Sequence, residues 1–355
     1  MQARGSRSLD PYLLLAELAL MGLSFVGVGS QDPHLLPALF LRLALALAVT
    51  YLCSRIPVVS ALQWGRWIWL LCAILLASVL LVGPQIGGVR RWLILPDGLS
   101  LQPSELVKVG LILYLAAYAG GSRRRRLSAG PRAILAVALS VLLVALEPDL
   151  GTAALILVLG LALLLWSGVP AKQLLIGLGL LALLGLLAVA LGHGHYTYAL
   201  HRLQRYLSAL RGGGPASTPY QLRIAHQMIA QAGWFGRGFR HKVPALPAGY
   251  TDMVSAAVIY AGGWVSGGLL ALAMAVVVWR GILLTLRCQG SERALAFGVS
   301  AYIAIQALTN LLVLVGTIPV TGVPLPLVSY GGSAMVSAGA ALGFLQAIHR
   351  RNSWR

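Results

Sequence analysis

Apolar residues dominate this chain in long runs that are separated by short polar segments. Ten of these runs have the roughly 17 to 25 residues that one helical crossing of a bilayer requires. They lie at residues 11–29, 34–53, 60–82, 104–120, 131–147, 151–168, 172–192, 253–279, 294–316 and 331–348. We therefore expect an all-α polytopic integral membrane protein with ten transmembrane helices, in which residues 1–355 form a single membrane domain.

Basic residues gather in clusters between the apolar runs and orient the chain. An even number of crossings places both termini on one side, and most clusters fall there, including Arg55, Arg123–Arg126, Lys172, Arg280 and Arg350–Arg351. Because cytoplasmic loops carry an excess of Lys and Arg, we expect both termini in the cytoplasm. The run Arg123–Arg126 is then an anchor of the topology.

The composition supports a membrane protein and excludes other classes. Apolar residues make up 58% of the chain and charged residues only 10%, with a mean hydropathy of +0.83, which leaves too little polar surface for a soluble globule. The net charge of +18 comes from dispersed clusters and not from a continuous basic face, so no nucleic-acid partner is expected. Cys53, Cys72 and Cys288 have no paired spacing, which argues against disulfides or a zinc site.

Two long segments, 83–103 and 193–252, and a short Pro-rich one, 317–330, lie on the outer face of this map. The large extracytoplasmic loop 193–252 contains two stretches, 200–211 and 220–232, whose apolar residues repeat at helical spacing opposite basic and polar ones. We expect these stretches to be amphipathic helices lying at the membrane interface. The alternative is a lid that only seals the bundle.

Four carboxylates stand at the outer edges of apolar runs: Glu105, Glu147, Asp149 and Asp252. An ionised carboxylate near the bilayer core costs several kcal/mol unless it is paired or hydrated, so one that is retained there is a candidate for function. The topology places all four at the outer leaflet, where they could face one site.

Each of these acids also has a structural interpretation. Asp149 and Asp252 precede apolar runs and could cap the helices that follow. Glu105 could pair with the lysine three residues later, on the same helix face. Deeper in the first two runs, Glu17 and Arg42 are expected to neutralise each other.

Cations accompany the acids on the outer face, against the positive-inside bias. They are Arg90, Arg91, Arg202, Arg205, Arg211, Arg223, Arg237, Arg240 and Lys242, with Lys108 one turn below Glu105. Guanidinium groups bind phosphate oxygens bidentately, so acids and cations at headgroup level suggest chemistry on a lipid-linked phosphate. Snorkelling of single side chains to lipid headgroups is the alternative.

If the substrate is a sugar on a polyprenyl pyrophosphate, the leaving group departs as a stable anion. One base then suffices, whereas glycoside hydrolases need two carboxyl groups. Asp252 fits this base best, because it follows the flexible stretch Pro244–Gly249 and lies at the bilayer edge, where partial desolvation raises a carboxyl pKa. A divalent cation, Mg²⁺ or Mn²⁺, is a candidate for neutralising the leaving group together with the outer Arg and Lys residues. The sequence assigns it no ligands, since His193 and His195 lack a third partner.

The segment Pro319–Ser333, with the sequence PVTGVPLPLVSYGGS, resembles the signature of the SEDS family (shape, elongation, division and sporulation). Further matches are Arg91-Trp92, Gln102-Pro103-Ser104-Glu105 with Lys108, Pro148–Thr152, Tyr220-Gln221, Gly236-Arg237-Gly238, Lys242 with Leu246-Pro247, and Thr251-Asp252. Within the family, Val320–Pro324 is similar to the RodA, or elongation, branch.

The resemblance implies a peptidoglycan glycosyltransferase in the bacterial cytoplasmic membrane that polymerises lipid II on the outer face during cell elongation. It would form β-1,4 glycan strands with inversion and work with a class B penicillin-binding protein, the transpeptidase. Asp252 matches the essential Asp of the family, which implies the catalytic base. Residues expected to bind substrate are Glu105, Lys108, Asp149, Arg91, Arg202, Arg237, Lys242, Ser329 and Tyr330.

The chain departs from the family pattern at two positions. The stretch Ala261–Trp264 lacks the acidic residues that commonly follow the family Asp, and Glu147 stands where Gln is usual. A lipid II flippase is the alternative function, and it predicts titratable residues on both membrane faces. Because the acids gather on the outer face, the sequence favours the enzyme. A scaffold without catalysis would leave these acids unexplained.

Overall fold

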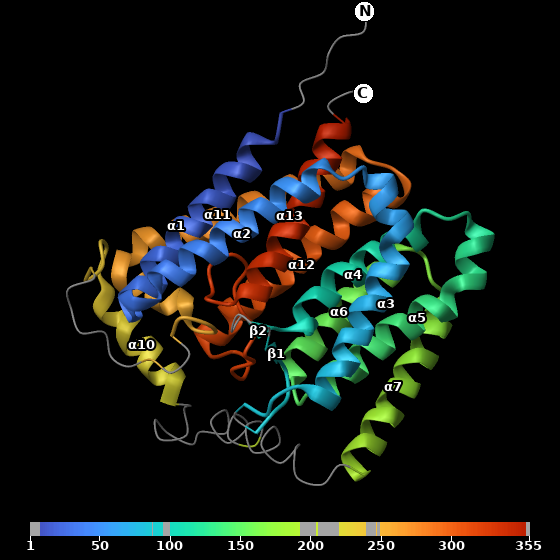
Figure 1. Ribbon diagram of the computed structural model, residues 1–355, viewed down its shortest axis with the longest axis horizontal. Coiled ribbons are helices and arrows are strands. Elements are labelled where there is room, and N and C mark those ends of the chain that lie inside the picture. The colour runs from blue at the N-terminus through green and yellow to red at the C-terminus, as the bar shows by residue number, and fades with distance from the viewer. Residues whose placement is uncertain are drawn as a thin grey trace, which may run out of the picture.

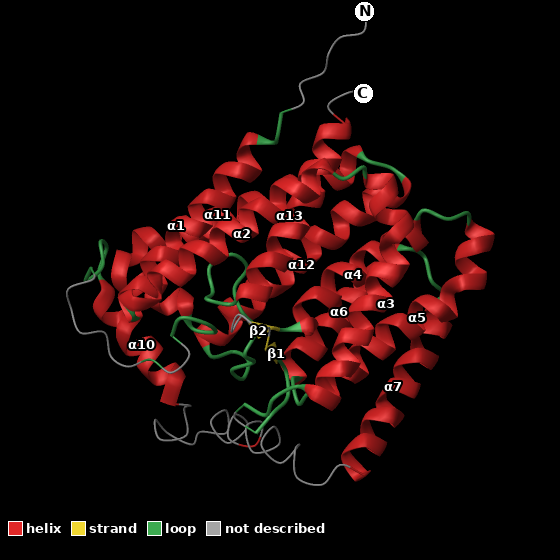
Figure 2. Ribbon diagram, in the orientation of Figure 1, coloured by secondary structure: helices red, strands yellow, loops and turns green. Residues whose placement is uncertain are grey.

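A computed structural model describes residues 8–86, 88–94, 100–191, 204, 220–238, 246 and 249–352, and this part of the chain is almost wholly helical (Figures 1 and 2). The helices are α1 (Pro11–Gln31), α2 (Leu36–Arg55), α3 (Val58–Val82), α4 (Pro103–Ala119), α5 (Arg123–Leu146), α6 (Leu150–Trp166), α7 (Ala171–Leu191), α10 (Tyr220–Ala232), α11 (Val254–Arg287), α12 (Gly290–Val315) and α13 (Gly332–Asn352). A short 3₁₀ turn, η1 (Pro33–Leu35), precedes α2, and β1 (Leu93–Ile94) pairs with β2 (Ser100–Leu101) in an antiparallel hairpin.

Six of the described helices are long and apolar enough to cross a membrane: α1, η1 with α2, α3, residues 128–146 of α5, α11 and α12. Helix α6 and residues 171–183 of α7 are apolar but shorter. The helical, multi-pass class predicted from the sequence is therefore confirmed. The beginning of α1 and the end of α13 lie at one end of the bundle, whereas α10 and the hairpin lie toward the other (Figure 1).

Helices α4 and α12 form the centre of the bundle. Helix α12 packs against α4, α6, α11 and α13, and α4 also contacts α3 and α5. Small residues allow close approach, as at Gly65 of α3, where a Cβ atom would lie 2.8 Å from the Leu113 backbone of α4. Because α4 is surrounded on most sides, even its polar residues are buried. Helix α7 packs against α5 at the edge of the bundle (Figure 1).

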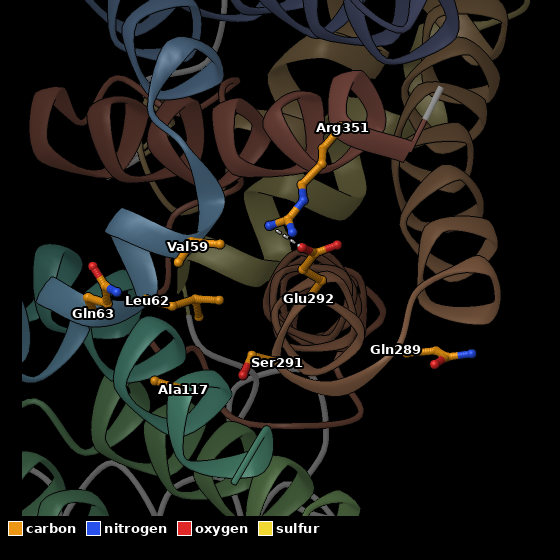
Figure 3. Close-up of a pocket in the computed structure, with 8 residues that line it drawn as sticks. All are labelled: Val59, Leu62, Gln63, Ala117, Gln289, Ser291, Glu292 and Arg351. Carbon is orange, nitrogen blue, oxygen red and sulfur yellow. Dashed lines mark ion pairs between the residues drawn. The ribbon is translucent and has the colours of Figure 1, made fainter. Parts of the chain in front are cut away.

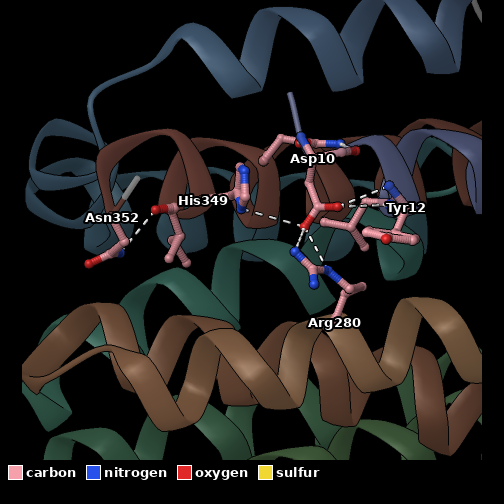
Figure 4. A network of polar contacts seen from close by, with 8 residues as sticks. Asp10, Tyr12, Arg280, His349 and Asn352 are labelled. Atoms are coloured by element: carbon pink, nitrogen blue, oxygen red, sulfur yellow. Dashed lines mark hydrogen bonds and ion pairs between the residues drawn. The ribbon is translucent and has the colours of Figure 1, made fainter. Parts of the chain in front are cut away.

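A buried ionic network joins three helices at the end of the bundle where α1 begins. Asp10 caps α1 by accepting hydrogen bonds from the backbone N–H groups of Tyr12 (3.0 Å) and Leu13 (3.3 Å). Its carboxylate also pairs with Arg280 of α11 and lies 3.5 Å from Nδ1 of His349 of α13 (Figure 4). These contacts fix the relative positions of α1, α11 and α13.

Helix α11 is broken at Gly263, which has φ 73° and ψ −173°. The run 253–279 was expected to be one continuous span, so this break is a correction. The segment Gly233–Gly238, called the strap below, supplies the backbone partners that the broken helix lacks. Gly233 and Trp234 accept bonds from the N–H groups of Trp264 (3.0 Å) and Val265 (3.2 Å). Two further bonds run from the strap to α11.

In these two bonds, the N–H groups of Arg237 and Gly238 donate to the carbonyls of Tyr260 and Ala261, each at 2.9 Å. The strap thus inserts four hydrogen bonds into the backbone ladder of α11. Two glycines permit this contact, since a Cβ atom on Gly236 would lie 2.2 Å from the Ala261 oxygen and one on Gly263 would lie 2.1 Å from the Trp234 oxygen. The strap therefore fixes the short helical segment that follows Asp252.

The amphipathic helix predicted at 220–232 is confirmed as α10. Its buried residues include Leu222, Ala225 and Met228, whereas Arg223 is exposed, and the helix packs on α11 and α12. The stretch 200–211 predicted as a second interfacial helix lies outside the described residues, apart from position 204.

Candidate active site

Segments far apart in the sequence meet around a cavity of about 290 Å³. Its lining residues are Arg42, Arg91, Trp92, Ser100, Gln102, Asp149, Thr251, Asp252, Gly322, Pro324, Tyr330, Gly331, Gly332, Ser333 and Ala334. Several sequence motifs thus contribute to one concave surface. A hydrogen bond holds two of these segments together: the backbone N–H of Gln102 donates to Oγ of Ser333 at 2.8 Å.

A larger cavity of about 410 Å³ lies between α3, α4, α12 and α13. Figure 3 shows that Glu292 and Arg351, which line it, point toward each other, and their charged atoms are 2.5 Å apart. This ion pair leaves neither charge available as an unpaired acid or base. The chemistry expected from the sequence is therefore concentrated in the smaller cavity.

Asp252 lies in the turn that leads into α11, and its backbone environment is fixed from two sides. The carbonyl of Thr251 accepts from Oγ of Ser329 (2.6 Å), and the carbonyl of Asp252 accepts from Nδ2 of Asn310 (2.8 Å). The N-cap position of α11 is Met253, so Asp252 lies one residue before the cap. Its position suits a group that acts in the cavity.

The carboxylate of Asp252 faces the buried loop between α12 and α13. A Cβ atom on Gly322 would lie 3.7 Å from Oδ2 of Asp252, and Gly322 has φ 80°, a conformation that favours glycine. One residue earlier, Thr321 packs against the start of α6, where a Cβ atom on Gly151 would lie 2.5 Å from its carbonyl oxygen. Tight backbone packing therefore brings the Asp149 turn and Asp252 to the same cavity.

Arg91 holds the turn between α5 and α6. Its Nε donates to the carbonyl of Glu147 (3.0 Å), Nη2 donates to the carbonyl of Pro148, and Nη1 lies 3.8 Å from Oδ2 of Asp149. The Asp149 carboxylate also accepts from the backbone N–H (3.2 Å) and the hydroxyl (3.0 Å) of Thr152. The capping role expected for Asp149 is thus confirmed. Both Arg91 and Asp149 line the cavity, but neighbouring groups occupy much of their bonding capacity.

Glu147 lies in the same turn, between the two helices, and its side chain is fully buried. Among the described residues, neither carboxylate oxygen of Glu147 has a hydrogen-bond partner. The pKa of Glu147 is raised to about 9, mainly by burial and also by the nearby charge of Asp149, while Arg91 opposes the shift. Glu147 is therefore a neutral carboxylic acid at physiological pH, and it does not line the cavity.

Arg42 lines the cavity, and the predicted pair between Glu17 and Arg42 is wrong. Glu17 accepts a hydrogen bond from the hydroxyl of Thr50 at 2.6 Å. Thr50 is eight residues beyond Arg42 on α2, or about 12 Å along the helix axis, so the two charges lie at different depths. The guanidinium of Arg42 instead lies over the ring of Tyr330, 3.8 Å from its centroid.

Glu105 and Lys108 form the pair within α4 that was considered as a structural alternative. Nζ of Lys108 lies 2.8 Å from both carboxylate oxygens of Glu105, and both residues are fully buried. Nζ also lies 5.2 Å from the ring centroid of Tyr302 of α12. Neither residue is among those that line the cavity.

The other expected binding residues have mixed positions. Tyr330 lines the cavity, but the Ser329 hydroxyl is occupied by the backbone N–H of Leu325 (2.7 Å) and the carbonyl of Thr251. Arg237 lies on the strap, where its Nε donates to the carbonyl of Gln231 at 2.7 Å, and it does not reach the lining. Arg202 and Lys242 lie outside the described residues.

Asn310 is a site residue that the sequence reasoning missed. Its Oδ1 accepts from the hydroxyl of Ser255 (2.8 Å), which orients the amide so that Nδ2 points to Asp252. Asn310 was a polar amide inside the apolar run 294–316, and this unusual position was the available signal.

The described residues do not form a dedicated divalent-cation site. Among them, no three His, Cys, Asp or Glu side chains gather closely enough to hold a metal ion. Asp149, one of the two cavity carboxylates, is already bonded to Thr152 and lies beside Arg91. The arrangement instead offers one carboxylate, a cationic wall and the start of α13, whose first backbone N–H groups favour negative charge. Such a site suits proton abstraction next to a departing anion.

Comparisons with known proteins found relatives over nearly the whole chain. A family model, FTSW_RODA_SPOVE, described as "Cell cycle protein", matches residues 20–354. The "Probable peptidoglycan glycosyltransferase FtsW" of Halomonas elongata is 31% identical over 358 residues, covering 95% of this chain and 89% of that protein. The "Peptidoglycan glycosyltransferase MrdB" of Escherichia coli K12 is 30% identical over 351 residues, covering 96% and 93%.

Solved structures share the fold. One chain, from the work "Structural coordination of polymerization and crosslinking by a peptidoglycan synthase complex", superposes with a TM-score of 0.77 at 31% identity, covering 97% of this chain and 98% of that chain. The rod shape determining protein RodA of Thermus thermophilus superposes with a TM-score of 0.72 at 29% identity and the same coverage. The similarity therefore extends over nearly the whole membrane domain.

Proposed function

The chain belongs to the FtsW/RodA/SpoVE family of cell cycle proteins, and on this basis we propose that it is a peptidoglycan glycosyltransferase that polymerises lipid II. The FtsW and MrdB relatives both carry the name peptidoglycan glycosyltransferase. The observation that carries the proposal is the placement of Asp252, which lines a cavity shared with Arg42, Arg91 and Tyr330. This combination supplies a base and positive charge at one place.

In the proposed topology, the chain crosses the bacterial cytoplasmic membrane ten times, with both termini in the cytoplasm. The positions of the ends of α1 and α13 at one end of the bundle support an even number of crossings (Figure 1). The basic clusters on that side support its cytoplasmic assignment. The cavity then opens near the outer leaflet, beside the large loop 193–252.

In the proposed reaction, Asp252 takes the proton from the 4-hydroxyl of the acceptor lipid II. The hydroxyl oxygen attacks the anomeric carbon of the growing lipid-linked chain, and the bond from that carbon to the pyrophosphate breaks. The electron pair leaves with the pyrophosphate, and inversion of the α-linked donor gives a β-1,4 bond. A general acid is unnecessary because the pyrophosphate is a stable anion, so the positioned carboxylate supplies the required proton transfer.

The other expected site residues divide into two groups in this proposal. Arg91, Asp149 and Tyr330 line the cavity and contact the sugar or phosphate groups. Glu105, Lys108 and Ser329 support the cavity from behind through the bonds described above. For the outer cations Arg202, Arg237 and Lys242, we propose contacts with parts of the substrate that extend beyond the cavity.

A class B penicillin-binding protein is the proposed partner. One solved relative comes from work on a peptidoglycan synthase complex that couples polymerisation to crosslinking. The elongation role rests on the stretch Val320–Pro324, because the FtsW and MrdB relatives are almost equally identical to this chain.

The test is polymerisation of lipid II by the purified chain together with its penicillin-binding partner, with and without divalent cations. We expect glycan strands from the wild type and from Asp32→Asn, a control at an acidic residue outside the cavity lining. Asp252→Ala and Asp252→Asn should abolish synthesis. Undiminished synthesis by either Asp252 variant would exclude the assigned base. Lipid II translocation in liposomes without glycan synthesis would favour a flippase.

A further inference from the structure

Arg42 and Arg91 are the two described cations that line the cavity, and they differ in whether a carboxylate lies beside the guanidinium. Arg91 donates to the carbonyls of Glu147 and Pro148 and lies beside the carboxylate of Asp149. For Arg42, by contrast, no described carboxylate forms an ion pair with the guanidinium. Its contacts there are the ring of Tyr330 and a hydrogen bond from Nη1 to the Tyr330 carbonyl at 3.5 Å.

The location of Arg42 makes this uncompensated charge informative. The residue lies within the apolar helix α2, where a guanidinium without a counterion is costly, so retaining one indicates a function. It lines the same cavity as Asp252. The acid expected to neutralise it, Glu17, is bonded to Thr50 about 12 Å further along α2. Because no described carboxylate pairs with Arg42, a ligand in the cavity can supply the negative charge that this guanidinium would bind.

The surroundings of Arg42 keep its guanidinium in place before a ligand arrives. The Tyr330 ring stacks under the group at 3.8 Å, and its carbonyl orients one edge. Stacking on an aromatic face leaves the remaining N–H donors in the plane of the guanidinium, where they match the spacing of two phosphate oxygens. A lysine would offer one compact charge and no such pair of parallel donors.

We propose that Arg42 is the principal phosphate-binding residue of the cavity and that it binds the pyrophosphate of a polyprenyl-linked donor. The inference deepens the proposed function and rests on it. It places the leaving group on the Arg42 and Tyr330 side of the cavity and the attacking hydroxyl on the Asp252 side. Arg91 then acts mainly through the Asp149 turn that it holds.

Two sources of phosphate chemistry must be separated, a lipid-linked pyrophosphate and the headgroup of an anionic phospholipid. The experiment uses the full-length protein in nanodiscs of zwitterionic phosphatidylcholine. One arm titrates a polyprenyl pyrophosphate and the other titrates phosphatidylglycerol. Tryptophan fluorescence reports binding, because Trp92 lines the cavity, and Trp92→Phe identifies the signal that comes from there.

We expect polyprenyl pyrophosphate to bind the wild-type protein. Arg42→Met should bind about 10- to 100-fold more weakly, since a charge-assisted hydrogen-bond pair is lost. Arg42→Lys should fall between them, and Tyr330→Leu should also weaken binding. Arg66→Met is the matched control, an exposed arginine on α3 outside the cavity lining, and should bind as the wild type does.

Unchanged affinity in both folded Arg42 variants would overturn the inference while leaving the glycosyltransferase assignment intact. A loss of affinity for phosphatidylglycerol alone would also overturn it, because the site would then be a lipid-headgroup site. Thermal unfolding of each variant identifies misfolding, and Arg42→Lys provides the second test if Arg42→Met does not fold. Failure of the proposed function is separate, since it would appear as glycan synthesis by Asp252→Asn.

Discussion

Nδ2 of Asn310 donates a hydrogen bond to the backbone carbonyl of Asp252 at 2.8 Å. This contact links the C-terminal part of the central helix α12 to the residue proposed as the catalytic base. The Ser255 hydroxyl holds the amide in the required orientation from the first turn of α11. The position of the base is thus set by two helices and not by the surface loop alone.

Replacing Asn310 with Leu should reduce polymerisation more than it reduces substrate binding. The variant keeps the branched side-chain shape with the same number of heavy atoms but leaves the Asp252 carbonyl without this donor, and a small displacement of a base lowers the rate of the chemical step. We expect kcat to fall about 10-fold with a small change in KM. Ser255→Ala should show a smaller loss. A rise in KM at constant kcat would contradict the positioning role.

Replacing Gly236 or Gly263 with Ala should release the strap from α11. Each Cβ atom would meet a backbone oxygen at 2.2 Å or less, and both residues have positive φ, so the contact cannot be kept without rearrangement. We expect faster hydrogen exchange at the amides of Arg237 and Gly238, together with lower polymerisation. Gly268→Ala is the control, because no atom lies within 4 Å of its added Cβ. Unchanged exchange in the two strap variants would contradict this coupling.

Removing one member of the Glu105–Lys108 pair should destabilise the protein. Glu105→Gln or Lys108→Met leaves a buried charge without its partner, which costs about 3–5 kcal/mol. The double variant Glu105→Gln with Lys108→Met removes both charges and should regain much of the lost stability. Thermal unfolding in detergent measures these effects. Additive destabilisation in the double variant would show that the pair does not behave as one unit.

Replacing Glu147 with Gln should stabilise the protein at alkaline pH. The folded pKa of about 9 is raised from 4.5, so the carboxyl stays protonated in the folded state while it ionises in the unfolded chain. Wild-type stability should therefore decline, relative to Glu147→Gln, as pH rises from about 4.5 to about 9. Melting curves at pH 5 and pH 8 test this, with a smaller difference expected at pH 5. If the stability of the wild type increased relative to that of Glu147→Gln as pH rises, this prediction would be contradicted.

Much of the secondary structure followed from the sequence because a bilayer leaves few choices. Backbone groups in lipid must be paired within the helix, so the length of an apolar run nearly determines the element. The predicted runs coincide with described helices to within a few residues at most ends, and the main exceptions are α5, which begins eight residues earlier at Arg123, and α11, which ends eight residues later at Arg287. Its break could not be predicted from Gly263 alone, since the strap that supplies the missing bonds is remote in sequence.

The sequence correctly identified Asp149 as a helix cap and Glu105 with Lys108 as an ion pair, because these interactions are local. It paired Glu17 with Arg42 wrongly. Counting residues from the ends of the two runs would have placed these groups at different depths. Asn310 received no role because its partner, Asp252, is 58 residues away along the chain.

By itself, the sequence determined the helical membrane class, the acids at the edges of apolar runs and the motifs that resemble a known family. These properties depend on composition, on spacing within one helix and on short stretches of chain. Only the tertiary structure decided which motif residues share the cavity with Asp252 and which are buried behind it. The physical reason is packing between distant segments, where close contacts at Gly151 and Gly322 and the depth of each charge along its helix select the neighbours. Arg42 faces the cavity for that reason.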